Sequence, residues 1–142
     1  MFTNKKTIIF ITKSKIKIAT IVMGNKPKEN IIAEINYSPA NLQEVLSRFK
    51  KDVGDVARIL LNEDITYTVT VFLPTGTHLD KNTIGQKLQE LIPEDLDKTV
   101  WDFKEVTPTT VQVIAVNKVL LEELVQAITK AGLHIEAIET LM

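Results

Sequence analysis

Histidine and cysteine, the side chains that most often serve as catalytic bases, nucleophiles and transition-metal ligands, are scarce in this sequence. The chain has two histidines and no cysteine, which excludes disulfides, thiolate metal sites and cysteine nucleophiles. His78 precedes Asp80 by two residues, a pair that could act in general acid–base catalysis, although a solvated loop histidine is the more common outcome. His134 alternates with apolar neighbours in a predicted strand, so its side chain is expected to face solvent. No His, Asp and Glu residues recur at metal-ligand spacing, and we predict no catalytic residue and no metal site.

Four acidic residues lie around the single tryptophan. Glu94, Asp95 and Asp97 precede Trp101, and Asp102 follows it. These acids could bind a partner protein, or they could form an ordinary acidic loop after a helix. Trp101 could be a core residue or an exposed anchor, because aromatic residues are favoured at interaction hot spots. The sequence leaves both alternatives open.

The positive charges are concentrated at the N-terminal end. Residues 1–28 hold seven lysines and no acidic residue, although the net charge of the whole chain is −1. Lys13, Lys15 and Lys17 form a predicted basic face, which could meet an acidic partner or could simply protect a sheet edge. Nucleic-acid sites normally interleave lysines with arginines or aromatics, and the first arginine here is Arg48. We therefore predict no nucleic-acid partner.

The length and composition indicate an ordinary globular protein. The chain has 142 residues, of which 44% are hydrophobic and 25% are charged. Its apolar runs are far shorter than the roughly 20 residues that span a bilayer. Polar residues at 12–14 interrupt the first apolar run too early for a signal peptide. We expect a cytoplasmic protein that does not insert directly into a membrane.

Hydrophobic periodicity predicts a mixed α/β (α+β) order of elements. In the first part we expect a three-strand meander over residues 6–11, 15–23 and 29–37, with a turn at 24–27. A helix over residues 42–53, which Ser38 or Asn41 caps, and a buried parallel strand over residues 56–61 follow. In the second part we expect a strand over residues 65–73, a helix over 80–91 and a hairpin of strands over 99–106 and 110–116. An amphipathic helix over residues 117–131, which Gly132 ends, and a last strand over 133–139 follow.

This order fits two architectures. The first is half of a ribonuclease H or actin-like body, in which residues 1–62 form a meander–helix–strand subdomain. Residues 63–116 would then be an inserted strand–helix–strand–strand interaction module, and residues 117–142 would return to the first subdomain. The second is a stand-alone ferredoxin-like unit that binds a small ligand in an apolar pocket.

Three segments of the second part carry a family resemblance. A strand ends at Leu73-Pro74 before a helix that ends at Ile92-Pro93, and an aromatic strand follows at 100–103. A Val-Ile-Ala-Val strand at 113–116 leads through Asn-Lys into an amphipathic helix that ends in Lys-Ala-Gly-Leu at 130–133. These segments resemble the type IV pilus assembly protein PilM and the related actin-like proteins FtsA and GspL. The resemblance implies an actin-like fold for nearly the whole chain.

The resemblance also implies where a nucleotide would bind. ATP-binding members carry an Asp-x-Gly hairpin near the N-terminus, in which the acid orients Mg²⁺-bound water and the glycine admits phosphate to the backbone. Phe10 stands at the position of the acid and Thr12 at that of the glycine, so the phosphate hairpin is degenerate. The second half of the family's nucleotide cleft is also absent from these 142 residues. We therefore expect no cofactor and no enzymatic activity.

The resemblance implies a role in assembly. We expect a non-catalytic scaffold that docks other pilus or secretion assembly proteins through its inserted module, with Leu73, Trp101, Asp102 and Phe103 as partner-binding residues. A short cytoplasmic peptide of an inner-membrane protein and a second copy of the chain are candidate partners, and the former would bring the chain to the inner membrane. The alternative function is a nucleotide-binding ATPase component whose second half lies outside this sequence.

Overall fold

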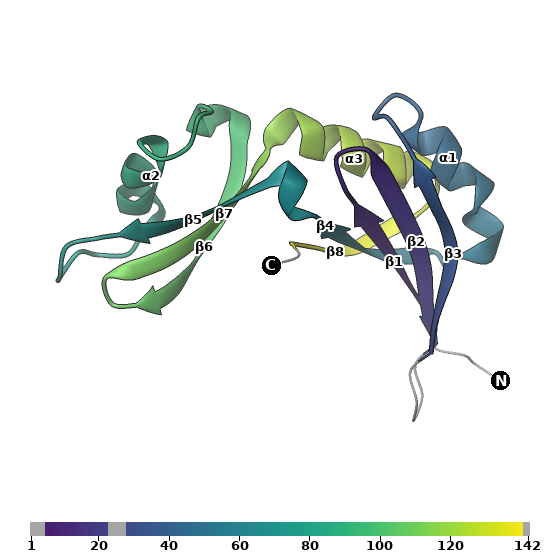
Figure 1. Ribbon diagram of the computed structural model, residues 1–142, viewed down its shortest axis with the longest axis horizontal. Helices are drawn as coiled ribbons and strands as arrows, with labels where there is room; N and C mark the ends of the chain where they lie inside the picture. The colour runs from purple at the N-terminus through teal and green to yellow at the C-terminus, as the bar shows by residue number, and fades with distance from the viewer. Residues whose placement is uncertain (1–4, 23–27, 141–142) are drawn as a thin grey trace. The chain divides into compact units, whose positions relative to one another are not determined.

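The computed structural model describes residues 5–22 and 28–140, and the predicted turn at 24–27 lies outside these ranges. The chain divides into two compact units (Figure 1). The first unit comprises Met1–Asp64 and Leu120–Met142, and the second comprises Ile65–Val119. For comparison, the sequence predicts the inserted module at residues 63–116. None of the helices in the described ranges is long and apolar enough to cross a membrane.

The first unit is built on a five-stranded sheet of order β3-β2-β1-β4-β8. The first three strands form an antiparallel meander, and β4 lies parallel to both β1 and β8. The meander and the parallel fourth strand are therefore as the sequence predicts. The strand bounds are β1 (Lys5–Ile11), β2 (Lys15–Val22), β3 (Lys28–Asn36), β4 (Val56–Leu61) and β8 (His134–Thr140).

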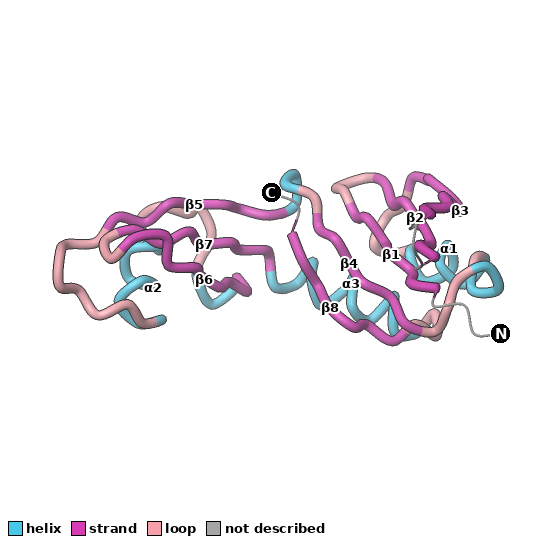
Figure 2. Tube along the Cα trace, turned by 90° about the horizontal axis from the view of Figure 1, so that it is seen from below, coloured by secondary structure: helices cyan, strands magenta, loops and turns pink. Residues whose placement is uncertain are grey.

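Two helices, α1 (Leu42–Arg48) and α3 (Lys118–Lys130), cover one side of this sheet (Figure 2). Alternate strand residues point toward them, because successive side chains of a strand face opposite sides. The core consists of isoleucines and leucines that are almost completely buried: Ile9, Ile11, Ile16, Ile18, Ile59 and Leu61 from the strands, and Leu42, Leu46, Leu124 and Ile128 from the helices. Burial of these side chains is the main stabilising contribution to the unit.

The first helix is shorter than its apolar periodicity predicts. It ends at Arg48 rather than near residue 53, and the chain continues as a 3-10 turn over Lys50–Asp52. Asn41 is the N-cap residue, one of the two predicted, but its side chain accepts a hydrogen bond from the Ser38 amide (2.8 Å) and makes none to the helix. The apolar pattern persists past Arg48 because the 3-10 turn still half-buries Phe49.

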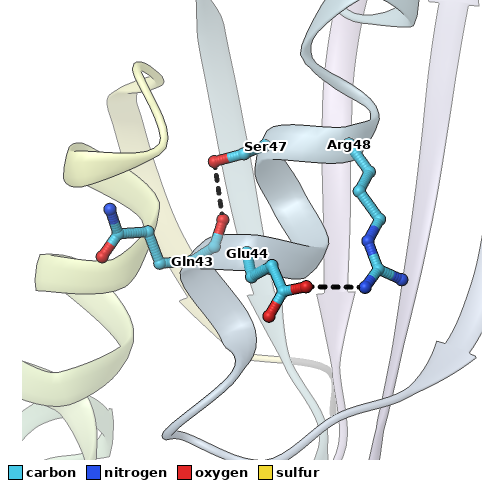
Figure 3. A network of polar contacts seen from close by, with 4 residues as sticks. All are labelled: Gln43, Glu44, Ser47 and Arg48. Carbon is cyan, nitrogen blue, oxygen red and sulfur yellow. Dashed lines mark hydrogen bonds and ion pairs between the residues drawn. The ribbon is translucent and has the colours of Figure 1, made fainter.

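Polar contacts on the solvent side of α1 run along the helix (Figure 3). Arg48 pairs with Glu44 at 2.7 Å, an exposed pair four residues apart that stabilises a helix only modestly. The Ser47 hydroxyl donates to the Gln43 carbonyl at 2.8 Å. A serine bonded to the carbonyl four residues earlier slightly destabilises a helix, which agrees with the early end of α1.

The second unit is a three-stranded antiparallel sheet of order β5-β7-β6 with α2 on one face. Its elements are β5 (Thr66–Phe72), α2 (Lys81–Gln89), β6 (Thr99–Thr107) and β7 (Thr110–Asn117), with 3-10 turns at Glu63–Ile65 and Leu96–Lys98. The apolar core contains Val71, Leu73, Ile84, Leu88, Ile92, Val111 and Val113. Because the described strands form two separate sheets, the prediction of a single ferredoxin-like plait is wrong.

Asp80 begins α2 by capping it. Its carboxylate accepts a hydrogen bond from the Thr83 amide at 2.8 Å, the geometry of an N-cap residue. Hydrogen bonds from Thr83, with a smaller contribution from the charge of His78, hold the pKa of Asp80 below its usual value of 3.8. The sequence motif that could have been a catalytic pair is therefore part of a helix start.

Gly132 ends α3 in a left-handed conformation with φ of +94°. The Gly132 amide bonds to the Thr129 carbonyl at 3.0 Å, and the Leu133 amide bonds to the Ile128 carbonyl at 3.3 Å. These two bonds form a Schellman motif, in which a glycine satisfies the last carbonyls of the helix. The predicted role of Gly132 is confirmed.

We predict that Asp80→Ala lowers the melting temperature at neutral pH, because the Thr83 amide loses its acceptor. The folded pKa of Asp80 is depressed, so its stabilising contribution is present above the ordinary aspartate value of 3.8 and disappears as the pH falls through the folded value. Thermal unfolding monitored by circular dichroism should therefore show the difference from the wild type shrinking below pH 3.8. Asp80→Asn, which keeps an acceptor, is the control and should remain close to the wild type at neutral pH. An unchanged melting temperature for Asp80→Ala at neutral pH would contradict the capping role.

We predict that Gly132→Ala lowers the free energy of unfolding by about 1 kcal/mol or more, because a residue with a Cβ is strained at positive φ. The added Cβ would also lie 3.1 Å from Cε of Lys50. Urea denaturation measures the difference, and Thr129→Ala, an exposed change in the same helix, serves as the control. Equal stability of the Gly132→Ala variant and the wild type would show that this helix end does not need its glycine.

Candidate functional site

The turn between β1 and β2 holds the residues where a phosphate hairpin would lie. The Thr12 hydroxyl accepts hydrogen bonds from the Ser14 amide (3.3 Å) and from the Lys15 amide (2.9 Å). The Thr12 amide itself donates to the Lys15 carbonyl at 2.9 Å. The turn therefore uses its own threonine side chain to satisfy amides that an anion-binding loop would leave free.

Side chains from two distant segments close this turn further. The Asp64 carboxylate accepts from the Lys13 amide at 3.0 Å, and the Tyr37 hydroxyl donates to the Thr12 carbonyl at 2.7 Å. Burial raises the pKa of Tyr37, and the Asp64 charge raises it further, so the phenol keeps the proton that it donates. A carboxylate at the Lys13 amide makes the turn unfavourable for a second negative group.

The predicted basic face is divided between two places. Lys13 lies in the turn and is exposed, whereas Lys15 and Lys17 alternate along β2 on the sheet face opposite α1 and α3. Nζ of Lys17 lies 5.3 Å from the ring centre of Phe10 and 3.9 Å from a carboxylate oxygen of Glu29. The positive charge of this face is therefore partly compensated by acids of β3.

The predicted His78–Asp80 pair has no catalytic geometry. His78 is 86% exposed, and its Nε2 atom lies 3.7 Å from Oδ2 of Asp80. His134 is exposed at the start of β8, as the sequence predicts. Within the described ranges, no three His, Asp or Glu residues are arranged to hold a metal ion.

Trp101 lies on the α2 face of the second unit and is half-buried. Its ring approaches Gly85 so closely that a Cβ at position 85 would lie 3.3 Å from it, so this close packing depends on the absence of a side chain there. Nζ of Lys81 lies 4.2 Å from the ring centre, a cation–π contact, and donates to the Trp101 carbonyl at 2.6 Å. The side chain is thus neither fully in the core nor a free anchor.

A shallow groove of about 610 Å³ runs beside this ring, along α2. Its floor combines the indole with Leu96 and Gly85, and its rim carries one ammonium and several amide side chains. The lining residues are Lys81, Asn82, Gly85, Gln86, Gln89, Leu96 and Trp101. Sequence reasoning missed most of these residues, although Lys81, Gly85 and Gln89 recur every four positions and so share one helix face.

The four predicted partner-binding residues do not lie on one surface. Leu73 is only 8% exposed and belongs to the core of the second unit, and Trp101 and Phe103 of β6 pack against this core. Asp102 is exposed on the opposite face of the sheet, and its carboxylate accepts from the Phe103 amide at 2.8 Å. Of the four, Trp101 alone lines the groove.

The acidic residues before Trp101 include one that connects several elements. Glu94 accepts a hydrogen bond from the Tyr67 hydroxyl (3.3 Å) and another from the Asn117 side-chain amide (3.1 Å). The charge of Glu94 and partial burial raise the pKa of Tyr67. Glu94 therefore ties the loop after α2 to β5 and to the end of β7, while Asp95 and Asp97 are exposed.

No protein-family model and no curated protein matches this sequence. Solved structures do match its fold. The chain is 15% identical to the cytoplasmic domain of EpsL, an inner-membrane component of the type II secretion system of Vibrio cholerae, with a TM-score of 0.70 over 96% of this chain and 57% of that one. It is 16% identical to a chain of the PilM–PilN type IV pilus biogenesis complex, with a TM-score of 0.71 over 95% of this chain and 47% of that one.

A Bacteroides thetaiotaomicron protein with an actin-like ATPase fold is also similar, at 7% identity and a TM-score of 0.61, over 96% of this chain and 52% of that one. The chain thus spans about half the length of each of these proteins. The predicted α/β architecture, a ribonuclease H or actin-like half domain with an inserted subdomain, is confirmed at the level of the fold. This chain has the actin-like fold that its resemblance to PilM and GspL implied.

Proposed function

We propose that this chain is a non-catalytic docking component of a type IV pilus or type II secretion-type assembly, acting in the cytoplasm beside the inner membrane. The observation that carries the proposal is the likeness of its fold to the EpsL cytoplasmic domain and to the PilM–PilN complex. The EpsL domain belongs to a type II secretion system, and PilM–PilN is a type IV pilus biogenesis complex.

The hydrogen bonds of the β1–β2 turn support the absence of ATP chemistry. Three of its amides, those of Lys13, Ser14 and Lys15, already have acceptors within the protein. Phosphate would have to displace the Thr12 hydroxyl and would meet the negative charge of Asp64. Phe10 supplies no oxygen to orient metal-bound water. The alternative of an ATPase component would need this turn to rearrange.

The groove beside Trp101 is the best candidate for the docking site of a short cytoplasmic peptide. An indole ring and Leu96 offer apolar surface, and aromatic residues are favoured where binding energy concentrates. Lys81 and the glutamine amides on the rim can donate to the carbonyls or to a carboxylate of an extended peptide. The charge of Lys81 favours a peptide with an acidic residue next to an apolar one.

We predict that a fluorescent ATP analogue with Mg²⁺ gives no saturable signal when it is titrated with this chain. The reason is that the backbone amides of the turn already have hydrogen-bond acceptors within the protein. Competition with unlabelled ATP separates specific binding from adsorption. Saturable binding that ATP reverses would support the ATPase alternative.

We predict that Gln86→Glu weakens the binding of a cytoplasmic peptide from the inner-membrane assembly protein of the same organism about tenfold, because a carboxylate on the rim of the groove would repel the acidic residue that Lys81 attracts. Fluorescence anisotropy of the labelled peptide measures the dissociation constant.

Gln126→Glu is the matched control, because it makes the same change on an exposed position of α3 in the first unit. It should leave the affinity unchanged. Equal affinities for wild type and Gln86→Glu, or a loss with the control alone, would place the docking site elsewhere.

A further inference from the structure

The three-stranded sheet of the second unit has two edge strands, β5 and β6, on either side of β7 (Figure 1). An edge strand presents backbone N–H and C=O groups that no neighbouring strand satisfies. Folded proteins normally protect such an edge with charged side chains, bulges or covering groups, since an open edge pairs with strands of other chains. The two edges of this sheet differ sharply in how they are protected.

Strand β6 carries several protecting devices. Its central residues include Asp102, Lys104 and Glu105. Its register with β7 shifts between Glu105 and Thr107, which marks a bulge. Two backbone groups of β6 also form hydrogen bonds with side chains. The Lys81 ammonium donates to the Trp101 carbonyl at 2.6 Å, and the Asp102 carboxylate accepts from the Phe103 amide at 2.8 Å. This edge is closed to a further strand.

Strand β5 carries none of these devices. The sequence of Thr66–Phe72, Thr-Tyr-Thr-Val-Thr-Val-Phe, contains no charge and no proline. It pairs with β7 in one unbroken register from Thr66 to Phe72. In the part of the chain that the structure describes, no side chain bonds to a backbone group of residues 67–72. Thr68 and Thr70 are exposed, and Phe72 is 68% exposed.

The side chains of β5 are also complementary to those of a second β5 strand. If two copies pair antiparallel about a two-fold axis at Val69, then Thr68 of each copy lies opposite Thr70 of the other. Phe72, which is 68% exposed, then lies opposite the β-branched Thr66 of the other copy, on the same face as the two threonines. Thr–Thr and aromatic–β-branched pairs are among the stabilising cross-strand pairs, and no like charges meet.

We propose that β5 is a homotypic docking edge, at which a second copy of this chain adds its own β5 in antiparallel register centred on Val69. The two three-stranded sheets then form one six-stranded sheet with both α2 helices on the same face. Main-chain hydrogen bonds supply affinity in such strand addition, and side-chain pairing sets the register. This contact needs no assembly partner, so it stands or falls separately from the proposed peptide site.

The test compares three forms of the full chain by sedimentation equilibrium. The wild type should show a concentration-dependent monomer–dimer equilibrium. Thr68→Lys/Thr70→Lys places lysine opposite lysine twice in the proposed register and should weaken dimerisation at least about tenfold. Thr68→Lys/Thr70→Glu places lysine opposite glutamate twice and should restore it. Because both variants change the same exposed positions, their comparison is independent of any general loss of folding, which circular dichroism checks.

Val100→Lys is the control for added charge, because it places a lysine on the protected strand β6. It should dimerise like the wild type. A wild type that stays monomeric up to about 1 mM would overturn the proposal, since that concentration reveals even weak association. Equal dimerisation of the Lys/Lys and wild-type forms would also overturn it, and failure of the Lys/Glu form to recover would overturn the register.

Discussion

The proposed function of this actin-like chain depends on the hydrogen bonds that close the β1–β2 turn. An actin-like nucleotide site requires backbone amides that are free to meet phosphate and an acid that orients metal-bound water. Here the Thr12 hydroxyl and the Asp64 carboxylate accept from the amides of the turn, and Tyr37 bonds to its carbonyl. These contacts satisfy polar groups that would otherwise need water or a ligand. The same bonds that stabilise the turn thus compete with any anion for its amides.

We propose that the turn performs no nucleotide chemistry, and the surfaces of the second unit are then the candidates for a binding function. Its sheet has one face packed against α2, where Trp101 fits against Gly85 and leaves a groove with a polar rim. It also has one edge closed by charged side chains and a bulge and another with no such protection. The difference in protection between the two edges of this small sheet is expected if the unprotected edge binds a further strand.

Local patterns in the sequence were sufficient to predict most elements, because each depends on near neighbours. Alternation in β1, β2 and β5 identifies their buried faces, and Gly132 marks the helix end at which φ is positive. The end of α1 could not be read in this way, since its apolar spacing continues into a 3-10 turn. The contacts of the β1–β2 turn could not be predicted from the sequence either. The contacts of Lys13 with Asp64 and of Tyr37 with Thr12 join residues 51 and 25 positions apart, and no local pattern indicates such pairs.

The most direct test of this account is an amide-resolved NMR titration of the ¹⁵N-labelled chain with Mg²⁺·ATP. It reports on the amides of Lys13, Ser14 and Lys15, which already have acceptors in the protein. The account predicts that these three resonances do not shift as the nucleotide is added. Saturable shifts centred on these amides, which would mean that phosphate displaces Thr12 and Asp64, would contradict it.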